Sequence, residues 1–126
     1  MEKRDSLREL LGIEVLDVKD GYAKMSMRIE EEHTNIHGFT HGGIIFSLAD
    51  CAFAEVTNFG ENKSVAVQVN INFIRPTQAG DTLTAEAIRA SEGKTFSICN
   101  ITVSKENKLV ALFTGLAYKI PLTKNQ

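Results

Sequence analysis

The stretch at residues 40–58, THGGIIFSLADCAFAEVTN, decides how this chain folds. Its apolar residues lie on nearly every side of a helix that we predict over residues 43–58, which indicates a helix buried almost all round. One carboxylate, Asp50, stands in the middle of this helix. Aspartate is a poor residue for a helix interior and is rarely buried without a partner. The stretch therefore predicts a central, buried helix. The presence of Asp50 in the middle of this helix needs an explanation.

Strand patterns surround this helix in the sequence. Upstream, a capping box at residues 6–9 predicts a short amphipathic helix, and Asp20 with Gly21 suits a type I′ turn between strands at 13–19 and 22–30. Residues without periodicity follow and predict a loop over 31–41. Downstream, period-two alternation predicts strands over 64–73, 82–91, 95–104 and 108–120. These strands are long enough to curl around one helix, so we predict an α+β fold with a mainly antiparallel β-sheet wrapped around one long central helix.

Composition limits the kind of protein. The length of 126 residues is the usual size of one domain, so we expect residues 1–126 to form a single domain. A net charge of -2 argues against an electrostatic nucleic-acid binder. Without a long apolar run we expect no membrane span and no signal peptide. Cys51 and Cys99 lie far apart in apolar surroundings, so we expect reduced core thiols and a cytoplasmic protein.

One face of the central helix consists of small or polar residues. Gly43, Ser47, Asp50 and Ala54 follow steps of four, three and four, so they share a helical face that predicts the wall of a cleft. Two interpretations of Asp50 stay open. It is either a structural carboxylate that caps a loop or pairs with an arginine, or a general base or nucleophile whose pKa is raised by partial desolvation.

The start of the helix offers groups that stabilise a developing negative charge. Gly42 and Gly43 place backbone N–H groups without intrahelical partners at the positive end of the helix dipole, as in an oxyanion hole. Asp50 lies seven residues beyond Gly43, about 10 Å along the axis, so one helix cannot place both groups on one carbonyl carbon. A second, antiparallel copy of the chain could do so. We therefore expect an obligate dimer with two shared active sites.

Other chemistries fit the sequence less well. His33, His37 and His41 recur every four residues, as metal ligands on a helix would, but glycines and an asparagine interrupt that segment, so we expect no metal. Cys51 points some 100° away from Asp50 around the helix and lacks an obvious histidine partner. We therefore expect Cys51 to pack in the core instead of acting as a nucleophile.

Two motifs carry a family resemblance: NIHGFTHGGIIFSLADCAFA, and after it INFIRPTQAGDTLTAEA. They combine HGG followed after six residues by Asp, a strand ending in F-x-R-P, and a G-D-x-L turn. With this combination the chain resembles a hotdog-fold acyl-CoA thioesterase of the phenylacetic-acid-degradation (PaaI-like) type, over nearly its whole length. The resemblance implies the hotdog fold, a homodimer usually paired into a homotetramer, active sites at the dimer interface, and no cofactor, since coenzyme A is part of the substrate.

The resemblance also assigns roles by position. It implies that Asp50 is the catalytic carboxylate and that the backbone N–H of Gly42, with Gly43 beside it, polarises the thioester carbonyl. Asn35 would orient the attacking water or the substrate, and His41 would hold the loop or approach the thioester. The chain departs from several relatives at Ala66, where they place a Ser or Thr hydroxyl that supports the carboxylate.

Substrate contacts are expected from several further side chains. Ser64 or Gln68 could substitute for the hydroxyl missing at Ala66, and Ser47 lies on the cleft face. For the phosphates of coenzyme A we expect basic side chains from the set Arg75, Arg89, Lys63 and Lys94. For the acyl group we expect an apolar lining from the set Phe39, Phe46 and Phe53.

Two alternative functions remain. One is a hotdog-type hydroxyacyl dehydratase, whose pattern the HGG opening fits poorly. The other is a non-catalytic module that binds acyl-CoA.

Overall fold

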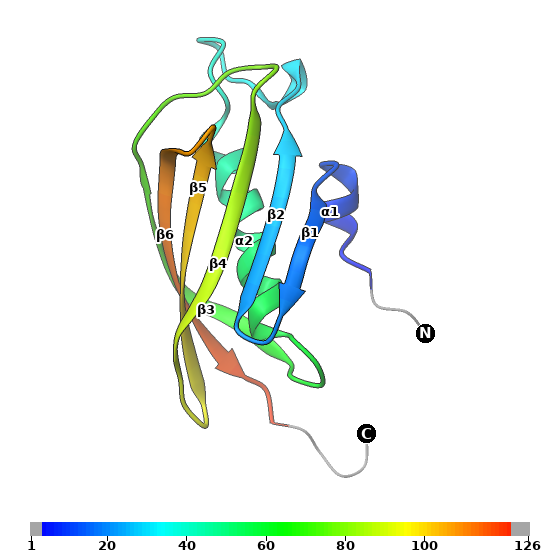
Figure 1. The fold of residues 1–126 in the computed structure, drawn as a ribbon, viewed down its shortest axis with the longest axis vertical. Helices are drawn as coiled ribbons and strands as arrows, with labels where there is room; N and C mark the ends of the chain where they lie inside the picture. Colours follow the sequence, from blue (N-terminus) through cyan, green and yellow to red (C-terminus); the bar gives the residue numbers. More distant parts are fainter. Residues whose placement is uncertain (1–3, 122–126) are drawn as a thin grey trace.

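The structure is a computed structural model that describes residues 4–121. Six strands form one antiparallel sheet in the order β1-β2-β4-β5-β6-β3, and one long helix lies on one face of it (Figure 1). The elements are α1 Ser6–Leu10, β1 Glu14–Lys19, β2 Tyr22–Arg28, the 3-10 helix η1 Glu31–His33, α2 Gly42–Thr57, β3 Ser64–Phe73, β4 Thr82–Glu92, β5 Phe96–Lys105 and β6 Lys108–Lys119. The predicted α+β fold, with an antiparallel sheet around one central helix, is confirmed.

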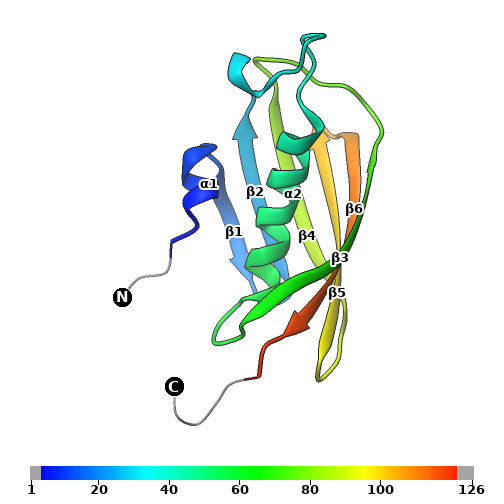
Figure 2. The same ribbon diagram turned by 180° about the vertical axis from the view of Figure 1, so that it is seen from behind.

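The core lies between α2 and the sheet. Figure 2 shows α2 from the side on which the sheet curves around it, and α2 contacts every strand. Phe53 of α2 is 2% exposed and packs its ring against Phe113 of β6, with ring centroids 5.7 Å apart. A Cβ at Gly115 would stand only 2.6 Å from the Phe53 ring, so β6 needs glycine at this position.

The central helix begins one residue earlier than predicted and is less buried. His41 is its N-cap, and the side chains of Ser47, Asp50 and Ala54 are only half-buried. The prediction of a helix buried almost all round is therefore wrong for a single chain. The half-buried residues belong to the small and polar face, so the structure leaves that face accessible.

Two local predictions are corrected. The type I′ turn needs positive φ at both central residues, and at the β1–β2 turn only Gly21 has it, whereas Glu106 and Asn107 at the β5–β6 turn have φ of 50° and 66°. The predicted capping box on α1 is also wrong. Asp5, not Ser6, is the N-cap, and its carboxylate accepts a hydrogen bond from the Arg8 N–H at 3.0 Å.

Strand β3 lies at one edge of the sheet and pairs only with β6 among the described strands. Its apolar side chains Val65, Val67 and Phe73 are 50%, 57% and 53% exposed. Val69 and Ile71 between them pack against the core, so the alternation marks the core face only in the middle of the strand. The register shifts between Ala66 and Gln68. Within residues 4–121 no helix has both the length and the apolar character needed to cross a bilayer.

Candidate active site

The start of α2 is organised by the side chain of its N-cap. His41 Nδ1 accepts a hydrogen bond from the Gly43 N–H at 3.2 Å, and the His41 N–H donates to the carbonyl of His33 at 2.8 Å. The Gly42 N–H has no acceptor within residues 4–121. Of the two amides predicted for an oxyanion hole, Gly43 is therefore occupied by His41, and Gly42 alone is free to bind a ligand.

A cavity of about 300 Å³ lies beside this free amide. It is lined by Phe39, Thr40, Gly42, Ile45, Phe73, Ile74, Arg75 and Pro76. A Cβ at Gly42 would approach the Phe73 ring to 3.2 Å, so the glycine keeps space between the helix start and the end of β3. Arg75 donates from Nη1 to the Leu109 carbonyl at 2.6 Å, which fixes the guanidinium at the rim.

The loop before α2 is folded by Asn35. Its side-chain oxygen accepts hydrogen bonds from the backbone N–H groups of His37 at 2.9 Å and Phe39 at 3.2 Å. The side-chain NH₂ of Asn35 donates to no acceptor in the described part of the chain. The sequence did not single out the buried hydroxyl pair that anchors the same loop, Thr77 Oγ1 donating to Thr40 Oγ1 at 2.7 Å. A pair 37 positions apart in sequence leaves no local signal.

Asp50 lies on the accessible face of α2, and its carboxylate has no hydrogen-bond or ion-pair partner among residues 4–121. Burial raises the pKa of the Asp50 carboxyl above its ordinary value, and the nearby Asp5 carboxylate adds to the rise. The structural interpretation, in which Asp50 caps a loop or pairs with an arginine, finds no such partner in the described residues. One turn earlier, Ser47 Oγ donates to the Gly43 carbonyl at 2.8 Å.

A second cavity lies at the opposite end of β3 and is basic. It has a volume of about 350 Å³, and its lining includes Lys63, Lys94 and Lys119 together with Thr95 and Tyr118. It lies where the β4–β5 hairpin and the end of β6 meet the start of β3, at the lower end of the sheet in Figure 1. The structure thus brings the predicted Lys63 and Lys94 together and adds Lys119, whose ammonium is paired with Glu92 at 3.3 Å.

The two arginines predicted with these lysines lie elsewhere. Arg75 is at the other end of β3, beside Gly42. Arg89 is paired with Asp20 at 2.9 Å and with Glu92 at 3.5 Å. These pairs leave Arg89 poorly suited to bind a phosphate.

The residues predicted to replace the hydroxyl absent at Ala66 differ in accessibility. Gln68 is exposed on β3, next to the register shift. Ser64 is buried near the end of α2, its N–H donates to Asn58 Oδ1 at 2.8 Å, and its hydroxyl lacks a hydrogen-bond partner in the described residues. Neither side chain contacts Asp50 through a hydrogen bond.

Two of the three predicted pocket phenylalanines are accessible. Phe39 lines the cavity beside Gly42, and Phe46 is half-buried against Phe113 with ring centroids 5.4 Å apart. Phe53 fills the core under Gly115, so its prediction as a pocket residue is wrong. The reason is that the helical position of Phe53 faces the sheet.

The cysteines are free and buried, as predicted. Burial raises the pKa of the Cys51 thiol to about 12 and that of Cys99 to about 11. Both thiols therefore stay protonated near neutral pH, which disfavours Cys51 as a nucleophile. Within residues 4–121 no group of three or more His, Cys, Asp or Glu side chains is arranged to hold a metal ion.

The model of the thioesterase superfamily matches residues 37–111, which span the loop, α2 and the strands up to β6. The chain belongs to the thioesterase superfamily. The resemblance to PaaI-like hotdog thioesterases, and with it the hotdog fold, is confirmed.

Two relatives place this thioesterase within the superfamily. It is 39% identical over 121 residues to the acyl-coenzyme A thioesterase PaaI of Escherichia coli K12, covering 95% of this chain and 86% of that protein. The structure of E. coli PaaI superposes with a TM-score of 0.91 at 38% identity, over 94% of this chain and 87% of that one. Human acyl-coenzyme A thioesterase 13 is 30% identical over 116 residues, covering 88% of this chain and 83% of that protein.

A ligand-bound neighbour adds to this comparison. Smu.793 of Streptococcus mutans UA159, solved bound to acetyl CoA, has a TM-score of 0.84 at 25% identity and covers 89% of this chain and 91% of its own.

Proposed function

We propose that this protein is an acyl-CoA thioesterase that hydrolyses an acyl-CoA to the carboxylic acid and free coenzyme A. The observation that carries the proposal is the half-buried Asp50 carboxylate, which has no partner among residues 4–121 and whose pKa burial raises. A carboxylate kept unpaired in a partly apolar place is costly, and such groups concentrate at catalytic sites. Two relatives are named acyl-coenzyme A thioesterases, and a third binds acetyl CoA, which supports the same substrate class.

The proposed active site is shared between two subunits. Asp50 stands eight residues after Gly42 on one straight helix, or ~12 Å along its axis, so the two groups of one chain cannot meet on one thioester. The unpaired edge of β3, with Val65 and Val67 half-exposed, offers the surface for a second copy. Antiparallel pairing would place Asp50 opposite Gly42 of the partner subunit, in a homodimer or in a homotetramer made of such dimers.

Catalysis follows from these two groups. Asp50 takes a proton from a water molecule while the water attacks the carbonyl carbon, and the carbonyl electrons move to an oxygen that the Gly42 N–H of the partner subunit binds. When the C=O bond forms again, the C–S bond breaks and the proton held by Asp50 passes to the sulfur of coenzyme A. In the alternative route Asp50 attacks the carbon itself, and water hydrolyses the resulting mixed anhydride.

The remaining residues bind the substrate in this proposal. Lys63 and Lys94 take phosphates of coenzyme A, while Arg75 lies at the rim of the cavity beside Gly42. Asn35 offers its free NH₂ to the water or the substrate. Gly43, Ser47 and Gln68 are proposed as further substrate contacts. The reaction needs no cofactor, and we propose that residues 1–126 act as one hotdog domain in the cytoplasm.

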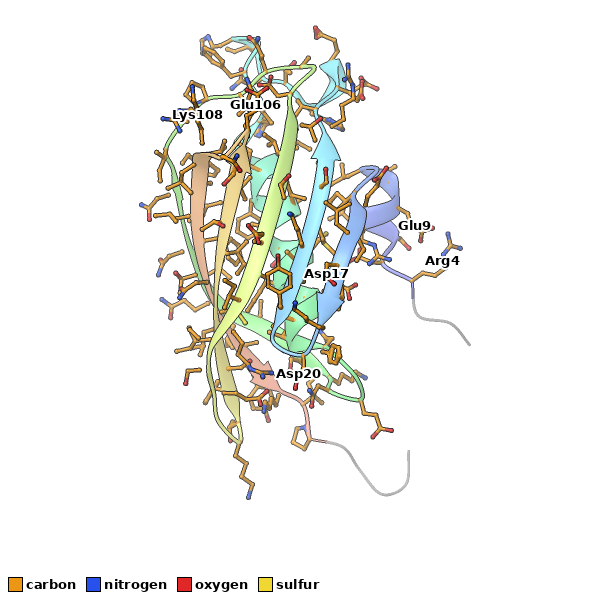
Figure 3. All side chains as sticks on the ribbon, viewed as in Figure 1. Arg4, Glu9, Asp17, Asp20, Glu106 and Lys108 are labelled. Atoms are coloured by element: carbon orange, nitrogen blue, oxygen red, sulfur yellow. The ribbon has the colours of Figure 1, made fainter. Side chains whose placement is uncertain are left out.

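The test is thiol release from a panel of aryl- and alkyl-CoA esters by the wild type, Asp50→Asn and Asp17→Asn. Asp17 is the matched control because it is an exposed aspartate on β1, away from α2 (Figure 3). The proposal expects turnover of at least one ester, a loss of about 10²–10⁴-fold in Asp50→Asn, and wild-type rates in Asp17→Asn. Saturable binding of acyl-CoA without turnover would instead indicate a binding module.

Isotope labelling separates the two routes. In a single turnover in ¹⁸O-labelled water, the general-base route puts all the label into the carboxylic acid. Label found in Asp50 contradicts that route and supports the mixed anhydride.

A further inference from the structure

We propose that Asp5, at the start of α1, is a positioning residue for the reaction: the docking of α1 on α2 holds its negative charge beside the Asp50 face of α2. This inference rests on Asp50 being the catalytic carboxylate. Nothing in the motifs of the chain points to Asp5, which is 45 positions away in sequence. Its proximity to Asp50 is produced by the docking of α1.

An ion pair docks α1 on α2. Arg8 Nη1 donates to Glu55 Oε1 at 2.7 Å, and the two side chains are 25% and 33% exposed. Glu55 follows Asp50 by little more than one helical turn. Because this pair fixes α1 against the second half of α2, the residues at the start of α1 lie over the same part of the helix.

Asp5 is held rigidly within α1. Its Oδ1 accepts from the Arg8 N–H at 3.0 Å, and its carbonyl accepts from the Glu9 N–H at 3.1 Å. The orientation of the carboxylate is therefore set by the helix cap. Because the helix cap already orders this side chain, its interaction with neighbouring groups costs no further side-chain entropy.

The surroundings of Asp5 place it next to Asp50. Burial raises the pKa of the thiol of Cys51, the residue that follows Asp50, and the nearby Asp5 carboxylate adds to the rise. Asp5 also lines a cavity of about 340 Å³ together with Ala54, which occupies the Asp50 face one turn further along α2. Asp5 thus lies beside the part of α2 that directly follows Asp50.

Cations near this cluster are already paired. Arg8 and Arg4 line the same cavity as Asp5; Arg8 is bound to Glu55, and Arg4 is bound to Glu9 at 2.8 Å (Figure 3). The side chains that the strands bury against α2 are uncharged within residues 4–121, and Cys99 is the titratable one among them. Burial is the larger cause of the raised pKa of Asp50. Among the charged groups of the described chain, Asp5 is the one that raises this pKa further.

The chemical consequence concerns the proton that Asp50 must accept. A carboxylate that ionises less readily is a stronger base toward water at the moment of attack. The like charge of Asp5 raises the pKa of Asp50 and so makes Asp50 a stronger base. The short helix α1, which carries Asp5, thus contributes to catalysis without touching the substrate.

The experiment compares the pH dependence of kcat/KM for the wild type, Asp5→Asn and Glu9→Gln in the full-length enzyme. Asparagine is as good an N-cap as aspartate, so Asp5→Asn removes the charge and keeps α1. Glu9→Gln removes an equal charge from the same helix, on the side directed away from the sheet. We expect the acid limb to move to lower pH in Asp5→Asn alone, and the difference from the wild type to shrink in high salt.

An acid limb that stays at the wild-type position in Asp5→Asn, or that moves equally in Glu9→Gln, overturns the proposal. A second readout does not depend on activity: the ¹³C NMR titration of the Asp50 carboxyl in the wild type and in Asp5→Asn. If this titration moves to lower pH in Asp5→Asn while no ester is hydrolysed, the effect of Asp5 on Asp50 is supported and the proposed thioesterase activity is contradicted. If the enzyme is active and the titration does not move, the role of Asp5 fails.

Discussion

His41 caps α2 through Nδ1, which accepts the Gly43 N–H at 3.2 Å, and this single hydrogen bond decides which amide at the helix start can bind a ligand. The Gly42 N–H is left at the positive end of the helix dipole, beside the cavity that Phe39 and Phe73 line. The predicted pair of donors thus becomes one donor with a defined position.

The first prediction concerns this donor. Gly42 is the first residue of α2, a position where proline is favoured in helices and where His41 already has the extended conformation that proline requires before it. Gly42→Pro therefore deletes the N–H with little cost to the helix. We expect kcat to fall about 10²–10³-fold. The matched control is Gly42→Ala, which keeps the N–H and puts a Cβ at a similar distance from Phe73; a loss as large in Gly42→Ala would mean that crowding, not the donor, explains the effect.

The second prediction concerns the core. A methyl group at Gly115 would meet the Phe53 ring at 2.6 Å, so we expect Gly115→Ala to lower the free energy of unfolding by about 1–3 kcal/mol through overpacking. Urea denaturation measures the change. Phe53→Leu in the same chain should recover part of the loss, because the smaller side chain makes room. Purely additive effects of the two substitutions would show that their contact is not the cause.

The third prediction concerns the basic cavity. Replacing Lys63 and Lys94 together by alanine should raise KM for acyl-CoA about tenfold and leave kcat near the wild-type value, because the phosphates of coenzyme A are bound equally in the ground and transition states. Lys108→Ala is the control, since Figure 3 places Lys108 at the opposite end of the sheet. Steady-state kinetics that show an unchanged KM in the double variant would move the phosphate site elsewhere.

The fourth prediction follows from the raised pKa of Asp50. Because the folded protein holds the Asp50 proton more tightly than the unfolded chain, whose aspartate has a pKa of about 3.9, stability is lost as pH rises from there through the folded pKa. Asp50→Asn removes this penalty. We therefore expect the variant to unfold at a higher temperature than the wild type at neutral pH, with the difference disappearing in acid below the pKa of the unfolded chain. Equal melting temperatures at neutral pH would contradict the desolvation of Asp50.

Local patterns explain what could be predicted from the sequence. The small and polar face of α2 follows from helical spacing, and the antiparallel hairpins follow from alternation between turn residues. The features that escaped prediction depend on contacts between distant segments: the edge position of β3, the approach of Lys119 to Lys63 and Lys94, and the docking of α1 on α2 through Arg8 and Glu55. The loss of the Gly43 amide to His41 is local, but it depends on a side-chain rotamer that a residue pattern does not encode.

In the proposed enzyme, each active site joins Asp50 of one subunit to Gly42 of its partner. Subunits carrying Asp50→Asn and subunits carrying Gly42→Pro, each inactive alone, can be joined in one dimer with two affinity tags and purified as the mixed species. In that dimer one site carries both substitutions and the other carries neither, so thiol release at about half the wild-type rate per dimer is the predicted result. Mixed dimers that remain as inactive as either parent would contradict the shared site, because a site built within one subunit cannot be restored by mixing.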